Sequence, residues 1–98
     1  MIQKFEILDK LRLSKLELNK FGVSRIGLFG SVSRNESNDD SDLDILIDFD
    51  SDLETFENYM NTCSFLEKVF KGYKLDIVTQ KGLSPFIGPY ILKEVEYA

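Results

Sequence analysis

The chain has 98 residues, of which 43% are hydrophobic and 30% charged, and its formal net charge is −5. This balance is typical of a folded α/β or other globular protein, and the length suits a single domain over residues 1–98. The acidic charge, without any block of Lys and Arg, argues against bulk binding of nucleic acid. No apolar run approaches roughly 20 residues and the amino end lacks a signal peptide, so we expect a cytoplasmic protein without membrane contact.

Missing residue types narrow the possible chemistry. The chain has no histidine and one cysteine, Cys63. A serine-histidine-aspartate triad, a histidine metal site, an intrachain disulfide and a cysteine zinc cluster are therefore excluded. Catalysis has to rest on carboxylates, hydroxyls, lysine, arginine or a metal held by oxygen atoms. Cys63 falls on the apolar stripe of a predicted helix, which indicates a core residue and not a nucleophile.

The first predicted element is a helix over residues 2–21. Apolar residues recur there at irregular helical spacing, at Ile2, Phe5, Leu8, Leu11 and Leu18. Gly22 follows as a left-handed cap. Ser14 with Glu17 has the spacing of a capping box, which leaves open whether a second helix begins inside the first.

Two strands separated by a turn and a loop come next. Residues 24–30 have strand character and end at Gly30-Ser31, where the chain must turn sharply and can open a short helix. Residues 35–41 predict a polar loop, and residues 43–49 predict the second strand.

A second helix is expected before the third strand. Ser51 and Glu54 form a capping box. Behind it apolar residues step by three and four along one face, at Leu53, Phe56, Met60, Cys63, Leu66 and Phe70. Gly72 ends this helix, and residues 73–79 predict the third strand.

The tail predicts a last, short helix. Ser84-Pro85 has the pattern of a cap followed by a first-turn proline, and Gly88-Pro89 interrupts the chain before a helix over residues 90–97. The order helix, strand, short helix, strand, helix, strand, helix predicts a small mixed β-sheet flanked by helices, an α/β (α+β) fold.

Aspartates alternate with aliphatic residues along the second strand. Alternate residues of a strand face the same side, so the apolar side chains form one face, at Leu43, Ile45, Ile47 and Phe49. The opposite face carries Asp42, Asp44, Leu46 and Asp48. In the third strand Asp76 lies opposite its apolar neighbours, so a neighbouring strand can bring Asp76 beside Asp42 and Asp44.

Three carboxylates at one place need a proton or a cation. Two such charges about 4 Å apart repel by about 4 kcal/mol at an effective dielectric constant near 20. Oxygen ligands alone suit Mg²⁺, which usually keeps water molecules and completes its coordination with substrate phosphates. The alternation by itself is also typical of the solvated face of an amphipathic sheet.

A calcium loop is the other alternative, and it fails on two positions. Asp40, Asp42 and Asp44 match the first three ligands of an EF-hand loop, but Ile45 replaces the required glycine and Ser51 the final glutamate. The turn upstream favours a phosphate site instead. A strand that ends in a Gly-Ser turn and opens a helix presents backbone N–H groups and a hydroxyl to an anion.

The segments "GLFGSVSR" and "SDLDILIDF", with a third acid on a later strand, resemble the signature of the DNA polymerase β-like nucleotidyltransferases. The length and the "FGSxxR" form resemble the minimal nucleotidyltransferase subfamily, and the resemblance covers essentially the whole chain. It implies a nucleotidyltransferase fold like the polymerase β palm. Bacterial members are encoded beside a HEPN-domain partner and act as the antitoxin of the pair, so the resemblance implies such a partner.

The resemblance also implies roles for individual residues. Gly30 and Ser31 would hold the triphosphate of ATP, the substrate. Asp42 and Asp44 would bind Mg²⁺, with two ions expected, and Asp76 would complete the metal site and assist deprotonation of the acceptor. All three aspartates are thus expected to be catalytic and metal-binding.

Two neighbouring positions are less clear. Arg34 either contacts phosphate or a partner, or forms a salt bridge to the acidic loop, and we favour the first slightly. Asn35 stands where many members of the family have glycine. Asparagine tolerates a left-handed backbone better than most residues, so the turn can survive.

The expected reaction is transfer of AMP from ATP to a hydroxyl, by the resemblance a tyrosine of the HEPN toxin. One alternative is an antitoxin with a vestigial acid site that neutralises its partner by binding alone. Another is a nucleotidyltransferase acting on small molecules, which is disfavoured because 98 residues leave little room for an acceptor pocket.

Overall fold

The computed structural model describes residues 3–38 and 40–98. The start of the predicted first helix at Ile2 and residue 39 of the predicted loop lie outside the described residues. Within them, four strands form one mixed sheet in the order β3-β2-β1-β4. The strands are β1 (Val23–Phe29), β2 (Leu43–Phe49), β3 (Leu75–Thr79) and β4 (Glu96–Tyr97). β1 is antiparallel to both β2 and β4, whereas β2 and β3 are parallel. A mixed sheet flanked by helices confirms the predicted fold class.

Three helices cover one face of this sheet: α1 (Lys4–Leu13), α2 (Lys15–Lys20) and α4 (Phe56–Val69). The buried core lies between them and the sheet. The strands contribute the apolar side chains Val23, Ile26, Leu28, Leu43, Ile45, Ile47 and Phe49. The predicted apolar face of the second strand is therefore confirmed, because all four of its residues belong to this core. None of the helices among the described residues is long and apolar enough to cross a membrane.

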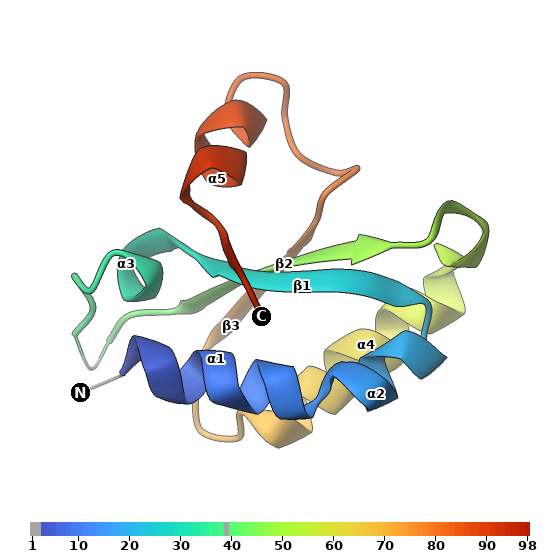
Figure 1. The fold of residues 1–98 in the computed structure, drawn as a ribbon, viewed down its shortest axis with the longest axis horizontal. Coiled ribbons are helices and arrows are strands. Elements are labelled where there is room, and N and C mark those ends of the chain that lie inside the picture. The colour runs from blue at the N-terminus through green and yellow to red at the C-terminus, as the bar shows by residue number, and fades with distance from the viewer. Residues whose placement is uncertain (1–2, 39) are drawn as a thin grey trace.

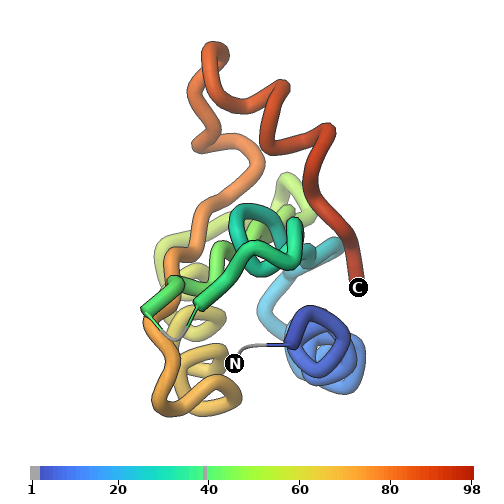
Figure 2. Tube along the Cα trace, turned by 90° about the vertical axis from the view of Figure 1, so that its left-hand side faces the viewer, coloured from blue at the N-terminus to red at the C-terminus, as the bar shows by residue number. Residues whose placement is uncertain are grey.

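The opposite face of the sheet carries Arg25, Gly27, Asp44 and Asp48, and we call it the open face. The helix α5 (Gly88–Glu94) stands on this side of the sheet, away from α1, α2 and α4 (Figures 1 and 2). The chain after α5 returns to the sheet as β4, beside β1. A Cβ atom on Gly27 would lie 2.6 Å from Val95 Cγ2, so a glycine is needed for this close approach.

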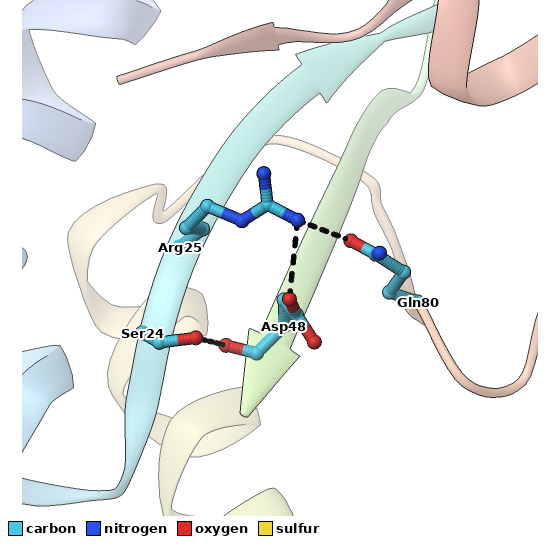
Figure 3. A network of polar contacts seen from close by, with 4 residues as sticks. All are labelled: Ser24, Arg25, Asp48 and Gln80. Carbon is cyan, nitrogen blue, oxygen red and sulfur yellow. Dashed lines mark hydrogen bonds and ion pairs between the residues drawn. The ribbon is translucent and has the colours of Figure 1, made fainter. Parts of the chain in front are cut away.

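A polar network fastens the same side of the sheet (Figure 3). Nη2 of Arg25 lies 3.3 Å from Oδ2 of Asp48 and donates to Oε1 of Gln80 at 3.1 Å. The Ser24 hydroxyl donates to the main-chain carbonyl oxygen of Asp48 at 2.9 Å. The Arg25 guanidinium also lies 4.5 Å from the ring centroid of Tyr97. These contacts join β1, β2, β4 and the segment that follows β3.

The amino-terminal helix is broken at Ser14, one of the two outcomes left open. The reason differs from the expected capping box, because α2 has no side-chain cap. The Ser14 hydroxyl instead donates back to the Lys10 carbonyl oxygen at 2.7 Å. A hydroxyl bonded to the preceding turn bends a helix locally. Gly22, with φ of +85°, is left-handed as predicted.

The start of α4 was predicted too early. Residues Ser51–Leu53 form a short 3-10 turn, and the cap is Thr55, whose hydroxyl accepts a hydrogen bond from Asn58 N at 3.1 Å. The proposed box of Ser51 and Glu54 does not cap this helix.

The predicted apolar stripe of α4 is also wrong in its first half. Phe56 and Met60 are 79% and 45% exposed, whereas Thr62, Leu66 and Phe70 are buried. Each residue of a helix turns by about 100°, so Met60 lies about 120° away from Leu66 around the axis. Cys63 is only half-buried and is not one of the core residues, contrary to the prediction. Burial raises the pKa of its thiol, which fits an unreactive cysteine.

The tail differs from the helix predicted over residues 90–97. α5 begins at Gly88 with Pro89 in its first turn and ends at Glu94, and residues 96–97 are β4. A proline fits the first turn of a helix because its missing N–H needs no partner there. Ser84 starts a turn and no helix, since its hydroxyl accepts from Phe86 N at 3.1 Å.

Candidate functional site

Predicted site residues from three strands meet at one end of the open face. Gly30 directly follows β1, and the last residue of β1, Phe29, is opposite Asp44 near the start of β2. Asp44 is in turn opposite Asp76 near the start of β3. The sheet topology brings these residues together. β2 is antiparallel to β1 and parallel to β3, so the end of β1 and the beginnings of β2 and β3 lie at the same end of the sheet. The predicted proximity of Asp44 and Asp76 is therefore confirmed.

Gly30 is in direct contact with the Asp44 carboxylate. Its φ is +75°, a left-handed conformation that side chains with a Cβ atom adopt at a cost. A Cβ atom there would lie 2.0 Å from Oδ2 and 2.8 Å from Cγ of Asp44. Only a glycine therefore allows the turn to lie against the Asp44 carboxylate. The predicted phosphate-binding turn is thus adjacent to the predicted metal ligand Asp44.

The environment of Asp44 opposes its negative charge. Burial, followed by the charges of Asp76 and Asp42 and a hydrogen bond with Asp76, raises the pKa of Asp44 to about 6. A hydrogen bond between two carboxyl groups requires a proton on one of them. A cation in the same place would relieve the repulsion and keep both groups ionised.

Asp42 is less closely engaged than the other two acids. It is exposed and directly precedes β2, and it acts on Asp44 through its charge. In residues 3–38 and 40–98 no three acidic, histidine or cysteine side chains converge closely enough to hold a metal as they stand. The donor set nevertheless fits Mg²⁺ chemically, because every candidate ligand is a carboxylate oxygen.

The turn that contains Gly30 continues as α3 (Gly30–Ser33) and ends at Arg34. Opening of a short helix at this turn was predicted and is confirmed. The backbone N–H of Arg34 donates to the carbonyl oxygen of Gly30 at 3.1 Å. Asn35 has a φ of +58°, so it takes the left-handed conformation that asparagine was expected to tolerate here.

The Arg34 guanidinium is held by two carboxylates. Its Nε lies 3.0 Å from Oε2 of Glu36, and its Nη1 contacts Oε1 of Glu94. Hydrogen bonds to Glu36 and then to Glu94 raise the pKa of Arg34 further. The ion pair with Glu36 matches the alternative of a salt bridge to the adjoining loop.

Glu94 is the site residue that the sequence did not indicate. It ends α5, contacts Arg34 and contributes, as the smallest of the causes, to the raised pKa of Asp44. No motif surrounds it, and it lies 60 positions from Arg34 in the chain. The weak signal available was a glutamate at a helix C-terminus, where negative charge is unfavourable.

Sequence comparison places these features among known proteins. Residues 8–98 match the nucleotidyltransferase domain family. The protein adenylyltransferase MntA of Thermococcus cleftensis is 37% identical over 98 residues, which cover 99% of this chain and 97% of that protein. A candidate protein adenylyltransferase of Methanocaldococcus jannaschii is 38% identical over 93 residues, which cover 93% of this chain and 89% of that protein.

Solved structures share the fold. A structure described as a candidate minimal nucleotidyltransferase is 28% identical, with a TM-score of 0.81 over 97% of this chain and 95% of that chain. An MntA–HpeT toxin–antitoxin variant has a TM-score of 0.62 at 18% identity, over 98% of this chain and 71% of that chain. A toxin–antitoxin structure with AMP-PNP has a TM-score of 0.59 at 22% identity, over 92% of this chain and 72% of that chain.

These matches extend over nearly the whole chain and agree with the motif from which a nucleotidyltransferase was predicted. The glycine turn and the acids of that motif are also adjacent in the fold. The chain therefore belongs to the nucleotidyltransferase domain family, among the minimal, MntA-like nucleotidyltransferases.

Proposed function

We propose that this chain transfers AMP from ATP to a hydroxyl of a partner protein and thereby acts as the antitoxin of a pair. The acceptor in this proposal is a tyrosine of a HEPN-domain toxin, and the reaction takes place in the cytoplasm within a single domain over residues 1–98. The names of the relatives support protein adenylylation, and the toxin–antitoxin neighbours support a toxin partner. The observation that best supports the proposal is the contact of the Gly30 turn with Asp44, which lies beside Asp76.

In the proposed reaction the acceptor oxygen bonds to the α-phosphorus of ATP. The bond from that phosphorus to the bridging oxygen of the β-phosphate breaks, and pyrophosphate leaves with the bonding electrons. The acceptor hydroxyl loses its proton, and Asp76, the exposed acid of the pair, is suited to accept it. No histidine is required for any of these steps.

The acids and the turn divide the work of binding. Asp42, Asp44 and Asp76 would hold Mg²⁺, with two ions expected, which supplies charge neutralisation at the attacking and leaving oxygens. Asp42 is exposed and so is free to turn toward the other two acids. Ser31 is half-buried, and no hydrogen bond of its hydroxyl is found among the described residues, so it is available to a phosphate oxygen.

A second candidate is an antitoxin that neutralises its partner by binding alone. Two observations favour it: the described acids do not converge into a three-ligand group, and Arg34 already has two carboxylate partners. The transfer proposal predicts that ATP with Mg²⁺ draws the acids together. The binding proposal predicts that protection of cells needs neither ATP nor the acids.

The test is the intact mass of both chains. The protein is purified together with the product of the neighbouring gene and incubated with ATP and Mg²⁺, or with ATP and excess chelator. We expect the partner to gain the mass of one or more AMP groups only with Mg²⁺, and Asp44→Asn to abolish this gain.

The matched control is Asp48→Asn, which removes a carboxylate from the same face of β2. Asp48 lies four residues further along the strand than Asp44, about 13 Å away at about 3.3 Å per residue. It should leave the mass gain unchanged. An unmodified partner in the wild-type reaction, together with full protection of cells by Asp44→Asn, would establish the binding-only function instead.

A further inference from the structure

Glu94 lies where its negative charge is disfavoured in three ways. It ends α5, and the C-terminal end of a helix already carries partial negative charge. Its side chain is only 23% exposed, so part of its hydration is lost. Its charge also adds to the negative charge that acts on Asp44. A carboxylate kept in such a place against local preference indicates a functional constraint.

The favourable contact of Glu94 is with Arg34. Glu36, the other partner of Arg34, is only two residues further along the chain and follows any movement of the arginine. Glu94 arrives from a different part of the fold and is anchored by β4, which pairs with β1. Glu94 is therefore the partner that fixes the guanidinium relative to the sheet.

The guanidinium retains binding capacity in this arrangement. Nε is used by Glu36 and Nη1 by Glu94. Within residues 3–38 and 40–98, no partner is found for Nη2 of Arg34. A planar guanidinium held at two of its nitrogens has one orientation, and the remaining N–H groups then point in a fixed direction.

We propose that Glu94 is a positioning residue for nucleotide binding: it orients Arg34 at the Gly30 turn so that the unpaired Nη2 contacts the triphosphate of ATP. This inference rests on the proposed function of the site. It gives α5 a part in binding the nucleoside triphosphate, although α5 stands apart from the helices that build the core (Figure 1). Partners that orient a ligand-binding side chain are worth about 10- to 100-fold at metal sites.

A double-mutant cycle tests the inference. Affinity for ATP with Mg²⁺ is measured by calorimetry for wild type, Glu94→Gln, Arg34→Ala and the double variant. We expect Glu94→Gln to weaken binding about tenfold in the wild-type background, at the low end of that range. In the Arg34→Ala background the same change should have less than about a twofold effect, since coupled residues are not additive.

A kinetic readout separates positioning from a structural role. If Glu94 acts on binding alone, Glu94→Gln should raise KM for ATP and leave kcat nearly unchanged. Asp48→Asn is the matched control, because it breaks the ion pair of Arg25 on the same open face, and it should leave ATP affinity unchanged. Equal losses in both backgrounds, or unchanged or tighter binding by Glu94→Gln, would overturn the inference.

If Glu94→Gln does not fold, Arg34→Lys replaces it: an ammonium keeps the charge but cannot hold two carboxylates in a fixed fork, so unchanged ATP affinity overturns the inference.

Binding is measured without transfer, so a wild type that binds ATP but never modifies its partner refutes only the proposed reaction. A wild type that modifies its partner, with Glu94→Gln binding ATP normally, refutes only the role of Glu94.

Discussion

Replacing Asp44 by asparagine should stabilise the metal-free protein at neutral pH. The pKa of Asp44 is raised from 3.8 to about 6, a shift of about two units. At 1.36 kcal/mol per unit, ionisation of this carboxyl at neutral pH would cost the folded state at most about 3 kcal/mol. Asp44 is partly exposed, and solvent screening reduces the expected effect to about 1 kcal/mol.

The sign of the pH dependence follows from the direction of the shift. Because the pKa is raised on folding, the folded state holds this proton more tightly than the unfolded state does. The contribution of Asp44 to stability is then fully present below pH 4 and is lost as pH rises through about 6. Asparagine has no proton to lose and stays neutral, so the variant and wild type should differ little at pH 4 and most at pH 7.5.

Urea denaturation with excess chelator at both pH values measures this difference. We expect Asp44→Asn to raise the free energy of unfolding by about 1 kcal/mol at pH 7.5 and by much less at pH 4. Added Mg²⁺ should stabilise wild type and not the variant, because binding to the folded state alone adds stability. A variant that is less stable than wild type at pH 7.5, or equally changed at both pH values, would refute the electrostatic explanation.

Three further substitutions test the turn and the sheet. Gly30→Ala should destabilise the protein by about 2 kcal/mol or more in urea denaturation and abolish ATP binding, because its Cβ atom would displace the Asp44 carboxylate. Ser31→Ala should leave the melting temperature unchanged and weaken ATP binding by about 1.5 to 3 kcal/mol in calorimetry; a collapsed melting temperature would make Ser31 a structural cap. Gly27→Ala should cost about 1 to 3 kcal/mol of stability, because its Cβ atom would lie 2.6 Å from Val95, and a neutral result would contradict the close packing of the C-terminal segment.

The acid pair could be predicted because strand geometry is local. Once Leu43 and Ile45 are assigned to the core, Asp44 has to face the other way, and the same holds for Asp76 in its strand. Gly30 was predicted for its backbone freedom, which the turn confirms. Its contact with Asp44 adds a reason that only the paired strands reveal.

The C-terminal part could not be predicted, because its structure depends on pairing with a distant strand and not on local geometry. Glu96–Tyr97 is a strand because β1 offers an edge to pair with. The segment is too short for the strand propensity of its own residues to decide against one more helical turn. The position of Glu94 depends in turn on that pairing. In α4 the prediction failed at Met60, because rotation accumulates along the helix and carries this residue about 120° away from the buried Leu66.

The fold argues against a merely solvated face as the reason for the alternating acids. A solvated face would leave the residues between the acids exposed, yet Leu46, which lies between Asp44 and Asp48, is fully buried. Those two acids also differ in their surroundings. Asp48 forms an ion pair with Arg25, whereas the negative charges of Asp76 and Glu94 act on Asp44. Repulsion at one end of the face and charge pairing at the other are not what solvation alone would produce. The unneutralised end is the one beside the Gly30 turn. A metal ion there would supply the missing positive charge and would in turn bind a triphosphate.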